Sequence, residues 1–146
     1  MLFKKKKPTK KVVYKAPATP PFDRDMKEYQ FPYSKGFRGF KRFNLIVHGN
    51  EESEKNNEKY YKNDFSNSTF MFKCFNYDAG QRVAQLFIDG HQIGAVFDDN
   101  MIYAIENGLI EKVHVEPRED FILGDKCTEV RHRITLLVKY VNPDEH

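Results

Sequence analysis

The stretch RVAQLFIDGHQIGAVF, residues 82–97, decides the fold more clearly than any other part of the sequence. It contains two largely apolar runs, 82–88 and 92–97, of the kind that form β-strands. Between them, Asp89-Gly90 is a residue pair typical of the tight turn of a β-hairpin. We therefore predict two antiparallel strands joined at this pair.

Strand-like sequence continues on both sides of the hairpin. Directly after it, Asp98 or Asp99 can cap a short helix, which Asn107-Gly108 ends. Four further strands are predicted over residues 43–48, 70–75, 110–116 and 130–141. Six strands with one or two short helices predict a mainly β fold, in the form of a small curled barrel.

Length and composition place these elements in one domain. The chain has 146 residues, of which 40% are hydrophobic and 14% aromatic, so it can build a single core. The net charge of +3 is unevenly distributed. Residues 1–42 carry 13 Lys/Arg and 3 Asp/Glu, whereas residues 43–146 carry 11 and 18. A basic segment of charge +10 is thus joined to an acidic one of charge −7.

The basic segment also predicts a domain boundary. Residues 1–30 begin with a Lys-rich cluster and contain several prolines, which disfavour helices and central strands. We predict that residues 1–30 form a flexible Lys/Pro-rich arm and that residues 31–146 form one domain. Residues 49–67, which are rich in Asn, Glu and Lys, are a polar insertion in that domain, either a long loop or an exposed helix.

Missing sequence features exclude several classes of protein. No run approaches about 18 apolar residues, so we expect no integral membrane association. The lysines near the start are not followed by an apolar stretch, so we expect no secretory signal. Cys74 and Cys127 are accordingly interpreted as reduced thiols of a cytoplasmic protein.

Metal binding and catalysis have little support. The five histidines and two cysteines form no CxxC or HxxxH pair, so we predict no metal site and no cofactor. No nucleophile elbow, glycine-rich phosphate loop or HExxH motif is present. Cys74 lies in an aromatic strand, where a cysteine usually acts as a small core residue. We therefore predict that the protein is not an enzyme.

Nucleic-acid binding has the most support. The Lys-rich cluster supplies charge that neutralises phosphates. Residues 31–43, FPYSKGFRGFKRF, alternate aromatic rings with cations, a mixture that stacks unpaired bases and holds the backbone. Arg131, Arg133 and Lys139 add a basic stripe to one face of the last strand. Two alternatives stay open: the lysines as a solubilising tail, lipid contact or import signal, and the rings as packing residues.

A further series of residues surrounds the central hairpin. Asn76-Tyr77-Asp78 precedes it, Asp89-Gly90-His91-Gln92-Ile93-Gly94 forms its turn and return strand, and residues 103–115 follow. In this order the residues resemble the HIRAN domain family, in which an NPYD motif leads into a strand, a DG-x-Q-[IV]-G hairpin and a short helix. The resemblance covers residues 76–116 and extends weakly back to residue 43.

The HIRAN resemblance implies a small barrel related in shape to OB and SH3-like folds. Family members fused to DNA-repair remodelling ATPases recognise the 3′ end of single-stranded DNA. By motif position, Tyr77 would stack on a base and Asp78 would lie near the terminal hydroxyl. The chain departs from the motif at three positions. Phe75 and Asn76 replace its Asn and Pro, and Ala95 replaces an aromatic residue or His.

We therefore expect a non-enzymatic, HIRAN-like module that binds nucleic acid, with single-stranded DNA or DNA ends as the ligand suggested by the family. The expected local site is Tyr77, Asp78 and His91, and the expected basic path is Arg38, Lys41, Arg42, Arg131 and Arg133. The alternative is a protein-interaction or structural β module that has lost the DNA site. Its sheet edges would pair with a protein partner or another copy of the chain. An enzyme whose site is assembled from scattered residues is the third interpretation.

Overall fold

The computed structural model describes residues 16–17, 25–78 and 80–141, except for the side chain of Asp78. These residues form seven strands and two helices. In chain order they are β1 (Lys27–Phe31), β2 (Lys41–Asn44), α1 (Glu51–Tyr60), β3 (Phe70–Asp78), β4 (Gln81–Ile88), β5 (His91–Val96), α2 (Asp99–Glu106), β6 (Ile110–Leu123) and β7 (Thr128–Tyr140). The predicted mainly β fold is confirmed, with one strand more than the six expected. Neither helix has the length and hydropathy needed to span a membrane.

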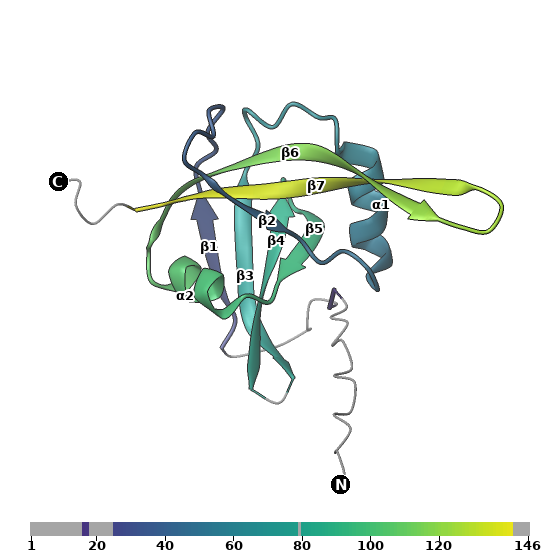
Figure 1. Ribbon diagram of the computed structural model, residues 1–146. Helices are drawn as coiled ribbons and strands as arrows, with labels where there is room; N and C mark the ends of the chain where they lie inside the picture. The colour runs from purple at the N-terminus through teal and green to yellow at the C-terminus, as the bar shows by residue number, and fades with distance from the viewer. Residues whose placement is uncertain (1–15, 18–24, 79, 142–146) are drawn as a thin grey trace, which may run out of the picture.

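The strands form two antiparallel sheets, and the long β6–β7 ribbon crosses the strands of the first sheet (Figure 1). The first sheet has the order β1-β3-β4-β5 and the second the order β2-β7-β6. Within the described residues, only two isolated bridges join them, Tyr33 to Val113 and Ile46 to Ala95. Closing a barrel requires continuous pairing around the sheet. The expected closed barrel is therefore not found in this part of the chain.

The predicted hairpin is confirmed at its turn. Ile88 pairs with His91 across Asp89 and Gly90, whose φ angles are +52° and +82°. Two consecutive positive φ values define the turn type that matches the twist of paired strands. Further along β5, a Cβ on Gly94 would lie 2.9 Å from the Cβ of Leu45. Gly94 therefore lets the chain after β2 pass close over β5.

The first sheet begins earlier than the predicted domain boundary. β1 pairs with β3 from Lys27 opposite Cys74 to Phe31 opposite Phe70, so the boundary between residues 30 and 31 falls inside a strand. The physical reason is that Tyr29 and Phe31 alternate along β1 and pack against the core. The flexibility predicted for the arm concerns mainly residues 1–15 and 18–24, which lie outside the described residues.

The main core lies between the two sheets and is closed at one side by α2. The largest side chains in it come from β3, β4, β5, β7 and α2, and they are fully buried: Phe70, Phe72, Leu86, Ile88, Ile93, Met101, Ile105, Ile134 and Leu136. Asp98 is one of the two residues predicted to cap this helix. It caps α2 by accepting a hydrogen bond from the Met101 backbone N–H (2.9 Å). Gly108, with φ of +69°, follows the end of the helix as predicted.

The polar insertion contains a helix, α1, which packs more closely than an exposed helix would. Asn50 caps it, and Ser53 and Asn57 on its inner face are fully buried. Asn57 Nδ2 donates to the Ile93 carbonyl of β5 (2.6 Å), and its Oδ1 accepts from the Ile134 N–H of β7 (2.8 Å). A single polar side chain thus joins both sheets.

The β6–β7 hairpin is longer than predicted and extends beyond the body of the fold (Figure 1). β6 continues to Leu123 and β7 begins at Thr128, because residues 117–123, which are both charged and apolar, continue the pairing with residues 128–134. At its end, Phe121 and Leu123 are 63% and 83% exposed.

Candidate nucleic-acid interface

Residues 31–43, the aromatic-basic segment, are attached to the second sheet near both ends. Near its start, Val113 N–H of β6 donates to the Pro32 carbonyl (3.0 Å), and Ser34 N–H donates to the Val113 carbonyl (2.8 Å). At its end, β2 pairs with β7. The intervening residues therefore form a loop that projects from a fixed base.

A tight turn forms the tip of this loop. Phe40 N–H donates to the Phe37 carbonyl (3.1 Å), and Gly39 has a φ of +82°. A four-residue turn with a positive φ at its third position selects glycine there, and it leaves the second residue, Arg38, exposed at the corner.

Phe37 caps a column of stacked rings. Its ring lies 4.8 Å from that of His114, which lies 5.3 Å from Tyr33, and Tyr33 lies 5.1 Å from Phe70 (centroid distances). His114 is buried, and its Nδ1 donates to the Ser34 carbonyl (2.7 Å). Phe37 itself is 46% exposed. The column thus presents one aromatic ring to solvent on a fixed support.

The remaining aromatic residues of the segment pack inward to different degrees. Phe31 contacts Phe72 edge-on (5.8 Å between centroids), and Phe31, Tyr33 and Phe43 all pack against the main core. Packing against the core thus accounts for three of the five rings, as expected from the alternative that these rings are packing residues. Phe40 is half-buried, and Phe37 is the one ring of the five in residues 31–43 that is exposed.

The predicted cations divide into two groups. Within the described residues, no carboxylate lies within 4 Å of the Arg38 or Lys41 side-chain nitrogens; the Lys41 ammonium instead lies 5.6 Å from the centre of the Phe43 ring. Arg42, in contrast, donates to Glu116 (2.6 Å). Of the three predicted cations in residues 31–43, Arg38 and Lys41 are therefore the two without a carboxylate partner among the described residues.

The three cations of the predicted stripe on β7 also have acidic partners, and Lys139 lies 3.2 Å from Glu111. Arg131 Nε donates to Glu129 (3.2 Å). Arg133 lies 3.7 Å from Glu54, and its side chain is only 8% exposed. Nearby opposite charges offset the attraction of these arginines for phosphate. The expected continuous basic path from residues 31–43 to β7 is therefore not formed by free cations.

Tyr77 lies far from this surface, near the β3–β4 turn that points away from the second sheet in Figure 1. Its ring is 41% exposed and contacts Phe97 edge-on, with 5.2 Å between centroids. The neighbouring predicted residue, Asp78, pairs with Gln81 through its backbone, and its side chain lies outside the described residues.

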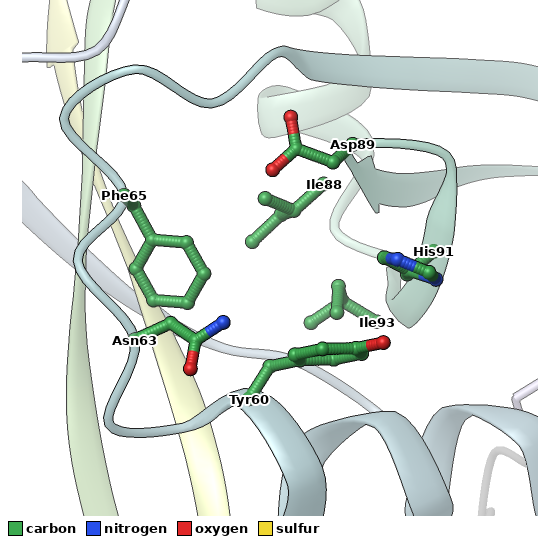
Figure 2. Close-up of a pocket in the computed structure, with 7 residues that line it drawn as sticks. All are labelled: Tyr60, Asn63, Phe65, Ile88, Asp89, His91 and Ile93. Atoms are coloured by element: carbon green, nitrogen blue, oxygen red, sulfur yellow. The ribbon is translucent and has the colours of Figure 1, made fainter.

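His91 lies at the opposite end of β4 from Tyr77. β4 spans eight residues, so the two ends are about 23 Å apart at about 3.3 Å per residue. The His91 ring stacks on Tyr60, with 4.6 Å between centroids, at the edge of a small pocket (Figure 2). The prediction that Tyr77, Asp78 and His91 share one local site is therefore wrong for His91, because a whole strand separates it from the other two.

The pocket beside His91 is polar at its rim and apolar inside. Asn63 and Asp89 lie at the rim with His91, and Phe65, Ile88 and Ile93 line the interior (Figure 2). Its volume is about 70 Å³. An engineered cavity of about 150 Å³ holds one benzene ring, so this pocket is too small for a nucleobase.

The residues that carry the HIRAN resemblance have structural roles in the hairpin. Asp89 and Gly90 form the turn, Ile93 is buried in the core, and Gly94 allows close packing. Asn76 accepts a hydrogen bond from Arg82 (3.0 Å), and Arg82 also binds Glu106 of α2 (3.0 Å). The contacts of these motif residues thus explain how they stabilise the fold, and they do not identify a ligand.

Two important residues are not singled out by the sequence analysis. His114 belongs there to a set of scattered histidines, yet it supports Phe37; the only signal is its place in a predicted strand. Asn57 lies in a polar stretch, and no pattern distinguishes it from its exposed neighbours.

The potential metal-binding side chains of the described part do not cluster, and the two cysteines differ in exposure. No three His, Cys, Asp or Glu side chains there come together as a group that could hold a metal ion. Cys74 is buried in the core, as predicted, and burial raises the pKa of its thiol to about 12. Cys127 is exposed.

No protein-family model matches the sequence, and no curated protein or solved structure is significantly similar to it. The HIRAN resemblance therefore rests on the quoted residues alone.

Proposed function

We propose that the protein is a non-enzymatic module that binds single-stranded nucleic acid on the surface formed by Phe37, Arg38 and Lys41. The observation that carries this proposal is the exposed ring of Phe37, supported from below by His114. Every nucleobase presents a flat face to such a ring, so this contact does not require a defined sequence. A rigid ring also stacks at a lower entropic cost than a mobile one.

Charge supports the same surface. Arg38 and Lys41 follow Phe37 at one and four positions along the chain, and they have no carboxylate within 4 Å among the described residues. They are therefore available to phosphates, whereas Arg42 is engaged by Glu116. The acidic character of residues 43–146 repels phosphate overall, which makes a local group of unpaired cations more important.

The HIRAN resemblance adds a more specific expectation. If it holds, the two sheets correspond to an incompletely closed barrel, with Tyr33–Val113 and Ile46–Ala95 as the points of contact. Tyr77 and Asp78 would then form a second site for a DNA 3′ end. Exposure of the Tyr77 ring is compatible with stacking there.

The test is fluorescence anisotropy with labelled single-stranded DNA, with its 3′ end free or blocked, at low and moderate salt. Binding that weakens with salt and is lost in Arg38→Ala supports the proposal. Arg42→Ala is the matched control, because this neighbouring arginine already has a partner and its loss is expected to matter less. No binding at low salt would reject the proposal. Sensitivity to the blocked end would support the second site.

A second candidate function, self-association, is favoured by the end of the β6–β7 hairpin. Phe121 and Leu123 share the strand face that packs into the core further back, at Val115, but here the face is uncovered. Asp125, Lys126 and Glu129 around it carry both signs of charge, so a two-fold-related copy can bring Lys126 opposite Asp125 or Glu129.

One sheet edge, the part of β7 before its pairing with β2, is already partly occupied within the chain. The N–H groups of His132 and Ile134 already donate to Glu58 (2.9 Å) and Asn57 (2.8 Å) of α1. These side chains occupy positions that a partner strand would use. Light scattering at increasing concentration tests the apolar contact. A dimer lost in Leu123→Asp supports it, and a monomer at all concentrations rejects it.

A further inference from the structure

Ala16 and Pro17, from the segment predicted as an arm, are docked on the domain by three hydrogen bonds. Ala16 N–H donates to the His48 carbonyl (2.8 Å). The Pro17 carbonyl accepts from Asn50 Nδ2 (2.8 Å) and from Gln85 Nε2 (2.9 Å). Ala16 is also buried.

Asn50 uses both ends of its amide. Its Oδ1 accepts from the Ser53 N–H and caps α1 (3.0 Å), while its Nδ2 holds Pro17. An aspartate at this position would keep the cap, because carboxylates cap helices well, but it would lack the donor. The two roles of Asn50 are therefore separable by one substitution.

Gln85 explains why the contact is specific. It lies in the middle of β4, and its side chain is 1% exposed. A buried amide N–H group needs an acceptor, and the Pro17 carbonyl provides one. A proline carbonyl can accept two hydrogen bonds while its ring restricts the chain to an extended course. The site thus fits an extended segment that presents such a carbonyl.

The described residues on either side of 18–24 lie on the outer face of the first sheet. Phe75, Val83 and Ala95 form a small buried cluster on this face, away from the main core, and Met26 packs against it. Gln85 lies opposite Ala95 in the strand register. Residues on either side of 18–24 therefore contact the same outer surface.

We propose that Asn50, Gln85 and the His48 carbonyl form a docking site for Ala16–Pro17 of the same chain, and that this site fixes the origin of the Lys-rich arm. The docking has a consequence for nucleic-acid binding, and this consequence rests on the proposed function. Seven lysines precede the docked pair in the chain: Lys4, Lys5, Lys6, Lys7, Lys10, Lys11 and Lys15. The docked pair therefore provides one fixed attachment point on the domain for this group of positive charges.

Limited trypsin digestion with mass spectrometry tests the docking without nucleic acid. Cleavage after Lys11 leaves a product that starts at Val12, whereas cleavage after Lys15 leaves one that starts at Ala16. Because Ala16 is buried and hydrogen-bonded, we expect the Val12 product to persist in the wild-type protein. In Asn50→Asp, we expect cleavage after Lys15 to be faster by on the order of tenfold or more, as local opening becomes easier.

Asn56→Asp is the matched control, because Asn56 also lies in α1 and donates to a backbone carbonyl, that of Gln92 (2.9 Å). It should digest like the wild type. Protection of the Ser53 amide from hydrogen exchange verifies that Asn50→Asp keeps its helix cap. Equal cleavage after Lys15 in wild type and Asn50→Asp would overturn the docking proposal, whatever the result of the DNA-binding test. A docked arm without DNA binding would reject only the proposed function.

Discussion

The exposed ring of Phe37 stacks on the buried ring of His114, with 4.8 Å between centroids and 19° between planes. Phe37 belongs to a loop before β2 and His114 to β6. Their contact therefore depends on the tertiary fold. It turns an aromatic residue of a glycine-containing loop into a platform with a defined orientation.

The two partners of this stack should differ in their contribution to stability. We expect Phe37→Ala to lower the free energy of unfolding by at most about 1 kcal/mol, because the ring is half exposed and loses a single stacking contact. His114→Ala should cost about 2–3 kcal/mol, since it leaves the Ser34 carbonyl without its donor and opens space in a buried site. Urea unfolding measures both. Equal losses would contradict this division.

Asn57 should be the most sensitive residue of the polar insertion. Asn57→Ala removes the donor to Ile93 and the acceptor for Ile134, so we expect a loss of about 2–4 kcal/mol in the free energy of unfolding. Lys55→Ala on the exposed face is the control. Its ion pair with Glu51 is largely solvent-exposed, and its loss should change stability by less than about 0.5 kcal/mol. Thermal or urea unfolding measures both, and equal losses would show that Asn57 does not join the sheets.

Stability should fall in acid partly through Asp120. Hydrogen bonds from the Arg118 guanidinium hold the pKa of Asp120 below its usual value. A carboxylate with a lower pKa in the folded state stabilises the fold above its unfolded pKa, near about 4, and loses this contribution as the pH falls through the folded value.

Asp120→Asn should therefore weaken the pH dependence. The test compares the free energy of unfolding at about pH 6 and about pH 3 in both proteins. We expect a smaller difference in the variant, because the amide that replaces the carboxyl group does not titrate. The same difference in both proteins would show that the Arg118–Asp120 contact contributes little in solution.

The two thiols should react at very different rates. Cys127 is exposed at the end of the β6–β7 hairpin, whereas burial keeps the Cys74 thiol protonated at neutral pH. We expect a thiol reagent to modify one cysteine in the folded protein and both after denaturation. Cys127→Ser should abolish the fast reaction. Rapid labelling of the folded Cys127→Ser variant would contradict burial of Cys74.

The fold is predictable from the sequence where local signals agree. Asp89-Gly90 between apolar runs identifies the central hairpin, and Asp98 and Gly108 mark the limits of α2. β1 escapes prediction because its alternation, Tyr29 and Phe31 among polar residues, is short and follows a proline-rich stretch. The outer half of β6, residues 117–123, escapes it because charged residues and a proline interrupt the apolar pattern there, whereas β7 is predicted from residue 130 onward.

The candidate site is predictable only in part. The sequence shows that residues 31–43 mix rings and cations, but packing alone decides that Phe37 stays exposed while Phe31 turns inward. Strand alternation groups Arg131 with Arg133, and it cannot show that nearby acidic residues neutralise both. The prediction that His91 lies beside Tyr77 is wrong because the order of residues in a motif does not give the distance between them in the folded hairpin.

The most direct test of the account compares the affinity of Phe37→Ala, Phe37→Tyr and Tyr77→Ala for a short labelled single-stranded oligonucleotide, measured by anisotropy at low salt. Stacking on one ring contributes about 1–3 kcal/mol per base, so Phe37→Ala should bind about tenfold or more weakly, while Phe37→Tyr should bind nearly as the wild type does. Unchanged binding by Phe37→Ala, with binding lost only in Tyr77→Ala, would contradict the account and place the site at the other end of β3.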